Sequence, residues 1–249
     1  MELLTHKNVN QDIKGIAGNL LFPKCAHVVD LGCGSGEEAI EIAMTIGKFG
    51  RVFAVDNNIE MFKRASGETK QLLPHECAEI SWINEDAHNV EFNESSIDLV
   101  LCRNTIHHFA DPNLILGKIS QWLKPKGQLI ISDILAPDNS KLQSLCNYAE
   151  RLENDDHIYF QTYVELERML NEAGFEIQST AEQINESGKE RNTLEFDKVL
   201  TEILRRSSSS VDNNAVRTSK ISALLPEITF YCFKSASFDK KQEKSKTCE

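Results

Sequence analysis

The stretch Val28-Val29-Asp30-Leu31-Gly32-Cys33-Gly34-Ser35-Gly36 decides the fold class of this chain. Its first four residues continue a short apolar run that is typical of a buried strand. Three glycines follow at alternate positions, and the apolar spacing over residues 37–46 then predicts a helix. Because glycine permits a positive φ and brings the backbone close to a ligand, this order of elements predicts a binding site at the helix N-terminus.

The rest of the chain repeats this alternation of strands and helices. Apolar runs that alternate with helical patterns predict an α/β fold, in which helices cover both faces of a doubly wound parallel sheet. The later strands are predicted at 51–56, 79–83, 97–102, 128–133, 175–178 and 228–233, and the helices at 9–21, 37–46, 58–72, 112–123, 140–155 and 161–173.

The composition excludes several classes of protein. The chain has 249 residues, with 27 Lys and Arg against 38 Asp and Glu, and a formal net charge of −11. Nucleic-acid binding depends on neutralising phosphates with Lys and Arg, so this charge argues against a nucleic-acid partner. There is no signal-peptide pattern and no run near the ~18 apolar residues of a membrane span, so we expect a cytoplasmic protein without membrane association. Seven scattered cysteines, none at metal-ligand spacing, predict reduced thiols and no metal site.

Glu37 distinguishes between two kinds of glycine loop. The dinucleotide-binding fingerprint G-x-G-x-x-G requires Gly or Ala at this position. A pyrophosphate at the same helix N-terminus would also lie close to the carboxylates of Glu37 and Glu38. The loop therefore favours a nucleoside ligand without phosphates, while an NAD-dependent oxidoreductase stays an alternative with a similar sheet.

Polar residues end or follow the next strands. Asp56 ends the second strand and can accept hydrogen bonds from the hydroxyls of a ribose, and Asp86 follows the third and can accept from an adenine amine. The fourth strand ends at Cys102. Each acid alone could instead be a turn residue or a helix N-cap. Together these strand ends predict one site at the carboxyl edge of the sheet, where open α/β sheets bind ligands.

Five motifs together resemble the class I S-adenosylmethionine-dependent methyltransferases. They are V-V-D-L-G-C-G-S-G, V-F-A-V-D, E-D-A, I-D-L-V-L-C-R-N-T-I-H-H-F-A-D-P and L-K-P-K-G-Q-L-I-I-S-D. The resemblance is to the small-molecule branch that includes the ubiquinone and menaquinone biosynthesis type; it is strong over 26–135 and weaker over 156–178. It implies a Rossmann-like seven-stranded sheet in the order 3-2-1-4-5-7-6, with the last strand antiparallel, and S-adenosylmethionine as the cofactor. The segment before residue 25 departs from the N-terminal signature of the quinone enzymes.

The resemblance also implies a role for individual residues of the cofactor site. Asp56 would bind the ribose, Asn57 and Met61 would flank the adenine, and Asp86 with the Ala87 backbone would read the edge of the base. The remaining implied cofactor residues surround the methionine part or follow the fourth strand: Asp30, Gly32, Cys33, Gly34, Gly36, Cys102 and His107.

Methyl transfer from a sulfonium requires little chemical assistance. It is an in-line displacement with a good leaving group, so positioning alone can suffice, and a base is needed only where the acceptor must lose a proton. His108 and His157 are the candidate catalytic residues, because the unperturbed pKa of histidine lies near neutrality. His108 could instead pack and fix the loop before Asp111, and His157 could instead face solvent or pack within the lid. Asp133, at the end of the fifth strand, either contacts substrate or caps the turn that follows it in the chain.

We expect one domain with helical insertions. Residues 25–235 would form the methyltransferase domain, 1–24 an N-terminal helix or lid, and 236–249 a disordered tail. Two further segments, about 136–160 and 185–222, are expected to form a lid over the site. The run Ser207-Ser208-Ser209-Ser210 is either a phosphorylation or partner-binding loop or a flexible connector. The sequence leaves open whether the protein is a monomer or a homodimer.

The sequence therefore predicts an enzyme that transfers a methyl group from S-adenosylmethionine to a small-molecule acceptor. Two alternatives share the same fold: a non-catalytic protein that binds S-adenosylmethionine or a partner, and a protein methyltransferase. No motif specifies whether the acceptor atom is carbon, nitrogen, oxygen or sulfur.

Overall fold

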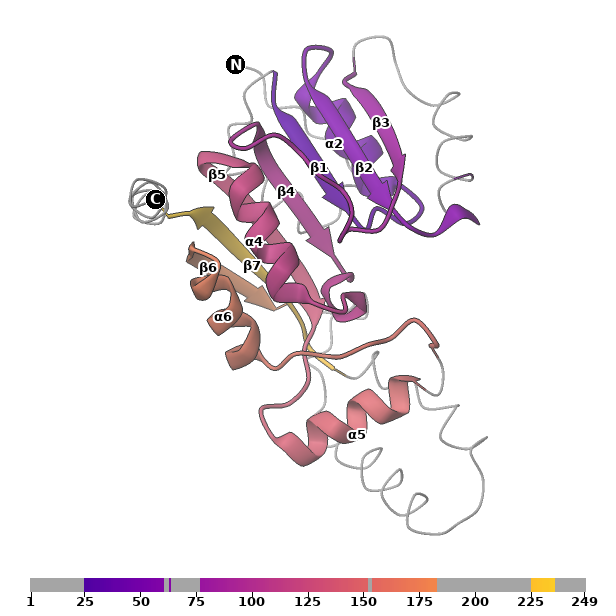
Figure 1. The fold of residues 1–249 in the computed structure, drawn as a ribbon, viewed down its shortest axis with the longest axis vertical. Helices are drawn as coiled ribbons and strands as arrows, with labels where there is room; N and C mark the ends of the chain where they lie inside the picture. Colours follow the sequence, from indigo (N-terminus) through magenta and orange to yellow (C-terminus); the bar gives the residue numbers. More distant parts are fainter. Residues whose placement is uncertain (1–24, 61–62, 64–76, 152–153, 183–224, 236–249) are drawn as a thin grey trace, which may run out of the picture.

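The computed structural model describes residues 25–60, 63, 77–151, 154–182 and 225–235, which form a seven-stranded sheet (Figure 1). The strand order β3-β2-β1-β4-β5-β7-β6 confirms the predicted fold class and topology. Only β7 runs antiparallel to its neighbours β5 and β6 within this described sheet. The strands are β1 (His27–Leu31), β2 (Arg51–Asp56), β3 (Glu79–Asn84), β4 (Ile97–Arg103), β5 (Leu123–Ile134), β6 (Phe175–Glu182) and β7 (Glu227–Lys234).

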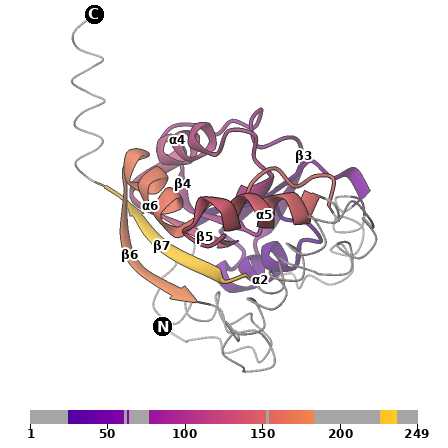
Figure 2. The same cartoon turned by 90° about the horizontal axis from the view of Figure 1, so that it is seen from below.

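Helices cover both faces of the sheet, as the alternation of apolar runs predicts (Figures 1 and 2). The helices α4 and α6 pack on one face of the sheet and α2 packs on the other. Each face has its own cluster of buried hydrophobic residues. On α4, Ile115, Ile119 and Trp122 follow helical spacing and are at most 1% exposed, so one stripe of the helix is buried in the core. The described helices are α2 (Glu37–Ile46), the short η1 (Ile106–His108), α4 (Pro112–Trp122), α5 (Ser140–Arg151) and α6 (Tyr163–Glu172).

The helix α5 lies apart from these layers, beyond the carboxyl ends of β4 and β5 (Figure 1). It contributes Cys146 and Ala149 to a third, small cluster of buried residues. Phe160, which precedes α6, fills that cluster and is fully buried. The segment predicted as a lid thus has a small apolar core of its own at the edge of the sheet where the strands end.

Local signals explain where the helices begin. The Asp111 carboxylate accepts the Leu114 N–H at 3.0 Å at the start of α4, where Pro112 is the first helical residue. Thr162 and Glu165 form a reciprocal capping box at the start of α6. These contacts satisfy backbone N–H groups that the first helical turn leaves without partners.

The structure differs from the sequence prediction at the start of β5, which begins at Leu123 rather than at Gln128. Leu123 pairs with Ile97, the register then shifts, and the ladder resumes where Leu99 pairs with Gln128. The turn-like residues 124–127 lie within this irregularity, where Lys126 has a φ of 65°. Residues 124–127, which resemble a turn in the sequence, therefore lie at an interruption within β5 and not before its start.

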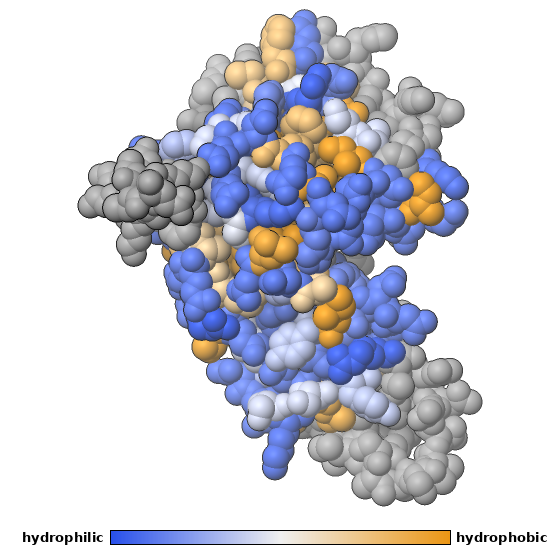
Figure 3. Space-filling model, in the orientation of Figure 1, coloured by the Kyte–Doolittle hydropathy of each residue, from blue (hydrophilic) through white to orange (hydrophobic). Residues whose placement is uncertain are grey.

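Several predicted segments lie outside the described residues. They are the helix over 9–21, most of the helix over 58–72, the lid segment 185–222 with its serine run, and the tail 236–249. Among the described residues, no helix is long and apolar enough to span a membrane. The face drawn in Figure 3 is largely hydrophilic, with hydrophobic residues in small separate groups.

Two glycines give opposite expectations for substitution by alanine. Gly32 has a φ of +78°, and a Cβ there would lie 2.2 Å from Thr105 Oγ1, so Gly32→Ala should lower the free energy of unfolding by about 2–4 kcal/mol. Gly117 lies inside α4, and a Cβ added there would have nothing within 4 Å. Gly117→Ala should therefore raise the free energy of unfolding by about 0.5–1 kcal/mol. Urea denaturation of both variants checks this pair; a neutral Gly32→Ala would show that the loop and Thr105 are not packed together as described.

Candidate functional site

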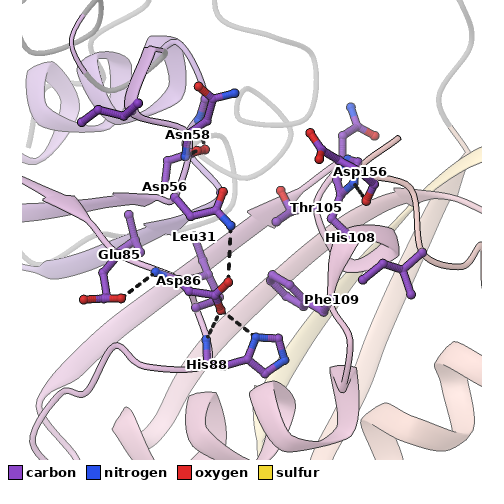
Figure 4. Close-up of a pocket in the computed structure, with 18 of the residues that line it drawn as sticks. Leu31, Asp56, Asn58, Glu85, Asp86, His88, Thr105, His108, Phe109 and Asp156 are labelled. Carbon is purple, nitrogen blue, oxygen red and sulfur yellow. Dashed lines mark hydrogen bonds and ion pairs between the residues drawn. The ribbon is translucent and has the colours of Figure 1, made fainter. Parts of the chain in front are cut away.

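A cavity of about 900 Å³ opens at the carboxyl edge of the sheet (Figure 4). Its walls come from the loops that follow β1, β2, β3 and β4, together with Asp155, Asp156 and Ile158 from the segment before α6. The strand ends predicted to converge therefore do so. The loops after β1, β2 and β3 form the first wall, and the β4 turn with Asp155, Asp156 and Ile158 forms the second wall, which includes part of the predicted lid.

The glycine loop after β1 is held against the end of β2. The N–H groups of Gly32 and Cys33 donate to the Val55 carbonyl oxygen at 2.8 and 3.0 Å. Asp56 accepts the Gly34 N–H on Oδ2 and the Asn58 N–H on Oδ1, both at 2.8 Å. Asp56 thereby fixes the loops on either side of it, and its carboxylate lies at the cavity wall (Figure 4).

Asp30 lies behind the glycine loop and is only 3% exposed. Burial raises the pKa of its carboxyl group well above the ordinary value, and the neighbouring Glu38 and Asp56 add to this effect. Its Oδ2 atom is buried without a hydrogen-bond partner among the described residues. A buried carboxylate oxygen of this kind is stabilised by a cationic donor placed beside it, such as an ammonium group.

Asp86 follows β3 and is held by its neighbours in the same wall. Its Oδ1 accepts the His88 N–H at 2.8 Å and lies 2.7 Å from His88 Nδ1, and its Oδ2 lies 3.3 Å from Asn57 Nδ2. The hydrogen bond from the His88 backbone is the largest cause that lowers the pKa of Asp86, so this carboxylate stays ionised and accepts hydrogen bonds.

The turn after β4 is organised by a buried carboxylate from β5. Asp133 is fully buried, and its Oδ2 accepts backbone N–H groups from Thr105, Ile106 and His107 at 3.2, 2.8 and 3.4 Å. Its Oδ1 lies 2.6 Å from His107 Nδ1 and accepts the Ile134 N–H at 2.7 Å. Asp133 therefore binds the turn after β4, a role that neither sequence-based alternative for this residue described.

This turn also holds the wall that precedes α6. The His107 carbonyl oxygen accepts the N–H groups of Ile158 and Tyr159 at 3.1 and 3.0 Å. His108 Nδ1 lies 2.9 Å from the Asp156 carbonyl oxygen, to which it donates. Both histidines thus connect the β4 turn to the segment that closes the cavity, and His108 itself lines the cavity.

His157 belongs to the packing of this second wall and is 3% exposed. Its Nε2 lies 2.8 Å from Asn147 Oδ1 on α5, and its ring packs on Phe160 at a centroid distance of 4.2 Å. Burial, followed by the nearby His107, lowers the pKa of His157 from 6.5 to about 4. The structure therefore places a neutral His157 between α5 and the β4 turn.

The predicted site residues fall into three groups. Those that line the cavity are Gly32, Gly34, Asp56, Asn57, Asp86, Ala87 and His108. Those that lie behind its walls are Asp30, Cys33, Gly36, Cys102, His107 and His157, and Met61 lies outside the described residues. Cavity residues without a predicted role are Leu31, Val55, Asn58, Ile59, Glu85, His88, Asn104, Thr105, Phe109, Asp155, Asp156 and Ile158. Position directly after a strand end is the signal that could have found Glu85, Asn104 and Thr105.

The buried cysteines near the site are poor candidates for reactive thiolates. Burial raises the pKa of Cys33 and Cys102 above the ordinary value and that of Cys146 to about 11. In the part of the chain that the structure describes, no three His, Cys, Asp or Glu side chains are placed to hold a metal ion. These thiols pack as small apolar groups.

The chain belongs to the class I S-adenosylmethionine-dependent methyltransferases, because a family model described as a methyltransferase domain matches residues 8–180. The match confirms the resemblance found in the motifs and separates the chain from the NAD-dependent oxidoreductases. S-adenosylmethionine is the cofactor of this family, and the residues present suit it. The partnerless Asp30 oxygen suits a cationic amino group, and the open space at the Cβ position of Gly34 leaves room for a ligand against the backbone.

Known proteins and solved structures match this chain at low sequence identity. An uncharacterized methyltransferase of Bacillus subtilis, YcgJ, is 24% identical over 144 residues, which cover 58% of this chain and 54% of YcgJ. The 2-phytyl-1,4-naphtoquinone methyltransferase of Nostoc punctiforme is 27% identical over 116 residues, or 47% of this chain and 50% of that protein. A methyltransferase structure from Bacillus halodurans matches with a TM-score of 0.65 and 21% identity, covering 91% of this chain and all of the other. The chain thus spans about half the length of these two curated relatives.

Replacing Asp133 by alanine should strongly destabilise the protein. The variant leaves the N–H groups of Thr105, Ile106 and His107 buried without their acceptor, so we expect a loss of about 3–5 kcal/mol in the free energy of unfolding, measured by urea denaturation. Asp138→Ala is the matched control, since Asp138 is exposed and should change stability by less than about 0.5 kcal/mol. Equal effects of both substitutions would contradict the anchoring role of Asp133.

His157 should make folding stability depend on pH. Its pKa is lower in the folded protein, about 4 against 6.5. Between these two pH values the unfolded chain binds a proton at His157 that the folded protein does not, and this proton binding favours unfolding. The stabilising contribution is complete above about pH 6.5 and is lost as the pH falls from about 6.5 towards about 4. In His157→Gln, which keeps a donor for Asn147, urea denaturation should show a smaller stability loss over this range than in the parent protein; identical pH profiles would contradict the shift.

Proposed function

We propose that this protein transfers the methyl group of S-adenosylmethionine to a small-molecule acceptor. The observation that carries the proposal is that one cavity joins the glycine loop, Asp56 and Asp86 to a second wall built from the β4 turn and residues 155, 156 and 158. The first wall suits an adenosine with an aminoacyl chain. The second wall lies where an acceptor would meet the methyl group.

The residues of the first wall would bind and orient the cofactor. Asp30 and the glycine loop would hold the methionine part, Asp56 the ribose, and Asp86 with the Ala87 backbone the edge of the adenine. When bound, S-adenosylmethionine supplies a methyl group on a sulfonium, which is already a good leaving group. The protein's main contribution is then to fix the position of the acceptor and to exclude water.

His108 is the better candidate for a base where the acceptor carries a proton. It lines the cavity, and because its Nδ1 donates to the Asp156 carbonyl oxygen, its Nε2 is the nitrogen that can accept a proton. His157 suits this role less, since it lies behind the wall and its lowered pKa makes it a weak base. We therefore assign proton transfer, where it is needed, to His108 and packing to His157.

One observation favours a small acceptor over a protein. The similar protein from Nostoc punctiforme is named for a naphthoquinone acceptor. We keep the sequence-based predictions of a cytoplasmic location and of no nucleic-acid partner as part of this proposal.

Calorimetry with S-adenosylmethionine and S-adenosylhomocysteine tests the cofactor part of the proposal. The parent protein should bind both, and Asp56→Ala should bind each more weakly by about 1–3 kcal/mol, the scale of lost hydrogen bonds to a charged group. Glu172→Ala is the control, because Glu172 is an exposed acid of α6 that pairs with Arg168 away from the cavity. Absence of binding by the folded parent protein would refute the proposal.

A labelling experiment distinguishes the acceptor classes. Methyl-labelled S-adenosylmethionine is incubated with the protein and with either a low-molecular-weight extract or a protein fraction. Label transferred to the small-molecule extract supports the proposal, and His108→Gln should reduce it if the acceptor loses a proton. Label found solely in protein would favour a protein methyltransferase, and cofactor binding without any labelled product would favour the non-catalytic alternative.

A further inference from the structure

His88 occupies an informative position beside Asp86, although its sequence position suggests no function. It lines the same cavity and contacts the Asp86 carboxylate twice, once through its backbone N–H at 2.8 Å and once through Nδ1 at 2.7 Å (Figure 4). Both contacts are made to the same oxygen, Oδ1. A single residue therefore occupies one side of the carboxylate.

The imidazole ring of His88 is fixed from several directions. The Asp111 N–H donates to His88 Nε2 at 3.3 Å, and Phe109 packs edge-to-face at a centroid distance of 6.0 Å. Lys118 Nζ donates to the His88 carbonyl oxygen at 2.6 Å and so holds the backbone. Because Nε2 accepts a hydrogen bond, Nδ1 carries the hydrogen and donates a hydrogen bond to Asp86. A rotation of the ring would break contacts on both sides.

This arrangement orients the Asp86 carboxylate. Two donors occupy Oδ1, whereas the contact of Oδ2 that the structure shows is to Asn57 Nδ2, at 3.3 Å. Oδ2 is therefore the oxygen with acceptor capacity left for a ligand. Since the pKa of Asp86 is lowered mainly by the His88 backbone contact, this oxygen can accept a hydrogen bond but cannot donate one.

We infer that His88 is a specificity-determining residue that acts through Asp86 to select a 6-amino purine over a 6-oxo purine in the cofactor. This inference rests on the proposed function, which places the adenine edge at Asp86 and Ala87. The amine of adenine donates to an oriented carboxylate oxygen, whereas the 6-oxo group of hypoxanthine presents a second acceptor and repels it. A site that is built to hydrogen-bond one polar group of its ligand rejects an analogue that lacks that group. A carboxylate that is free to turn away would reject the analogue less.

The test compares the affinities of S-adenosylhomocysteine and its deaminated analogue, S-inosylhomocysteine, by calorimetry. His88→Phe keeps a ring against Phe109 but removes both nitrogens, and His88→Asn keeps a donor near the Nδ1 position without the ring. We expect His88→Phe to lower the preference for the adenine compound by about tenfold and His88→Asn to keep it within about threefold. The matched controls are His27→Phe and His27→Asn, because His27 is an exposed residue at the start of β1 outside the cavity.

The outcomes separate this inference from the proposed function. An unchanged preference in a folded His88→Phe, or a loss in His88→Asn as large as in His88→Phe, overturns the role of His88. If His88→Phe does not fold, His88→Asn decides: a retained preference supports the role and a lost one overturns it. A parent protein that binds S-adenosylhomocysteine without preferring it also overturns the inference, whereas a parent protein that binds neither compound refutes the proposed function itself.

Discussion

The buried carboxylate of Asp133 is the contact on which the functional edge of this fold depends. It fixes the backbone of the β4 turn through Thr105 and its two successors, and it orients the ring of His107. The side chain of Thr105 in turn occupies the space where Gly32 has no Cβ, so the glycine loop packs directly on this turn. The ends of β1, β4 and β5 are thereby held in one arrangement. A buried carboxylate surrounded by donors satisfies the general requirement that buried charge be hydrogen-bonded.

Three other carboxylates show how local surroundings give one residue type different properties. Asp56 accepts two backbone N–H groups, and Asp86 is held by His88, so both are oriented in advance of ligand binding. Asp30 has a buried oxygen without a partner and a raised pKa, which places unfavourable electrostatic energy behind the glycine loop. An ammonium group bound there would relieve that energy. Under the proposed function, these three carboxylates would favour a ligand that combines hydroxyl, amine and cationic groups.

The sequence predicted most of the fold and the strand ends that meet at the cavity, because both depend on local signals. Buried parallel strands are short apolar runs, and the residues that follow them necessarily lie at one edge, so the strand pattern alone was enough to place Asp56 and Asp86. The strand order came from the resemblance and not from the pattern. The start of β5 was misplaced because residues 124–127 resemble a turn, while pairing with β4 continues around them. His88 was missed because its function depends on contacts with Asp111 and Phe109, which no spacing in the sequence indicates.

The second wall of the cavity depends on contacts between residues far apart in the chain. Asp133 binds residues 105–107, and the carbonyl oxygen of His107 binds the backbone of residues 158 and 159, about 50 positions further on. Because His107 contributes its backbone carbonyl here, the wall can be anchored without fixing the side chains that face the cavity. Side chains at 155, 156 and 158 can therefore differ while the turn and the cofactor loops stay in place. The backbone of this sheet edge is thus held separately from the side chains that residues 155, 156 and 158 present to the cavity.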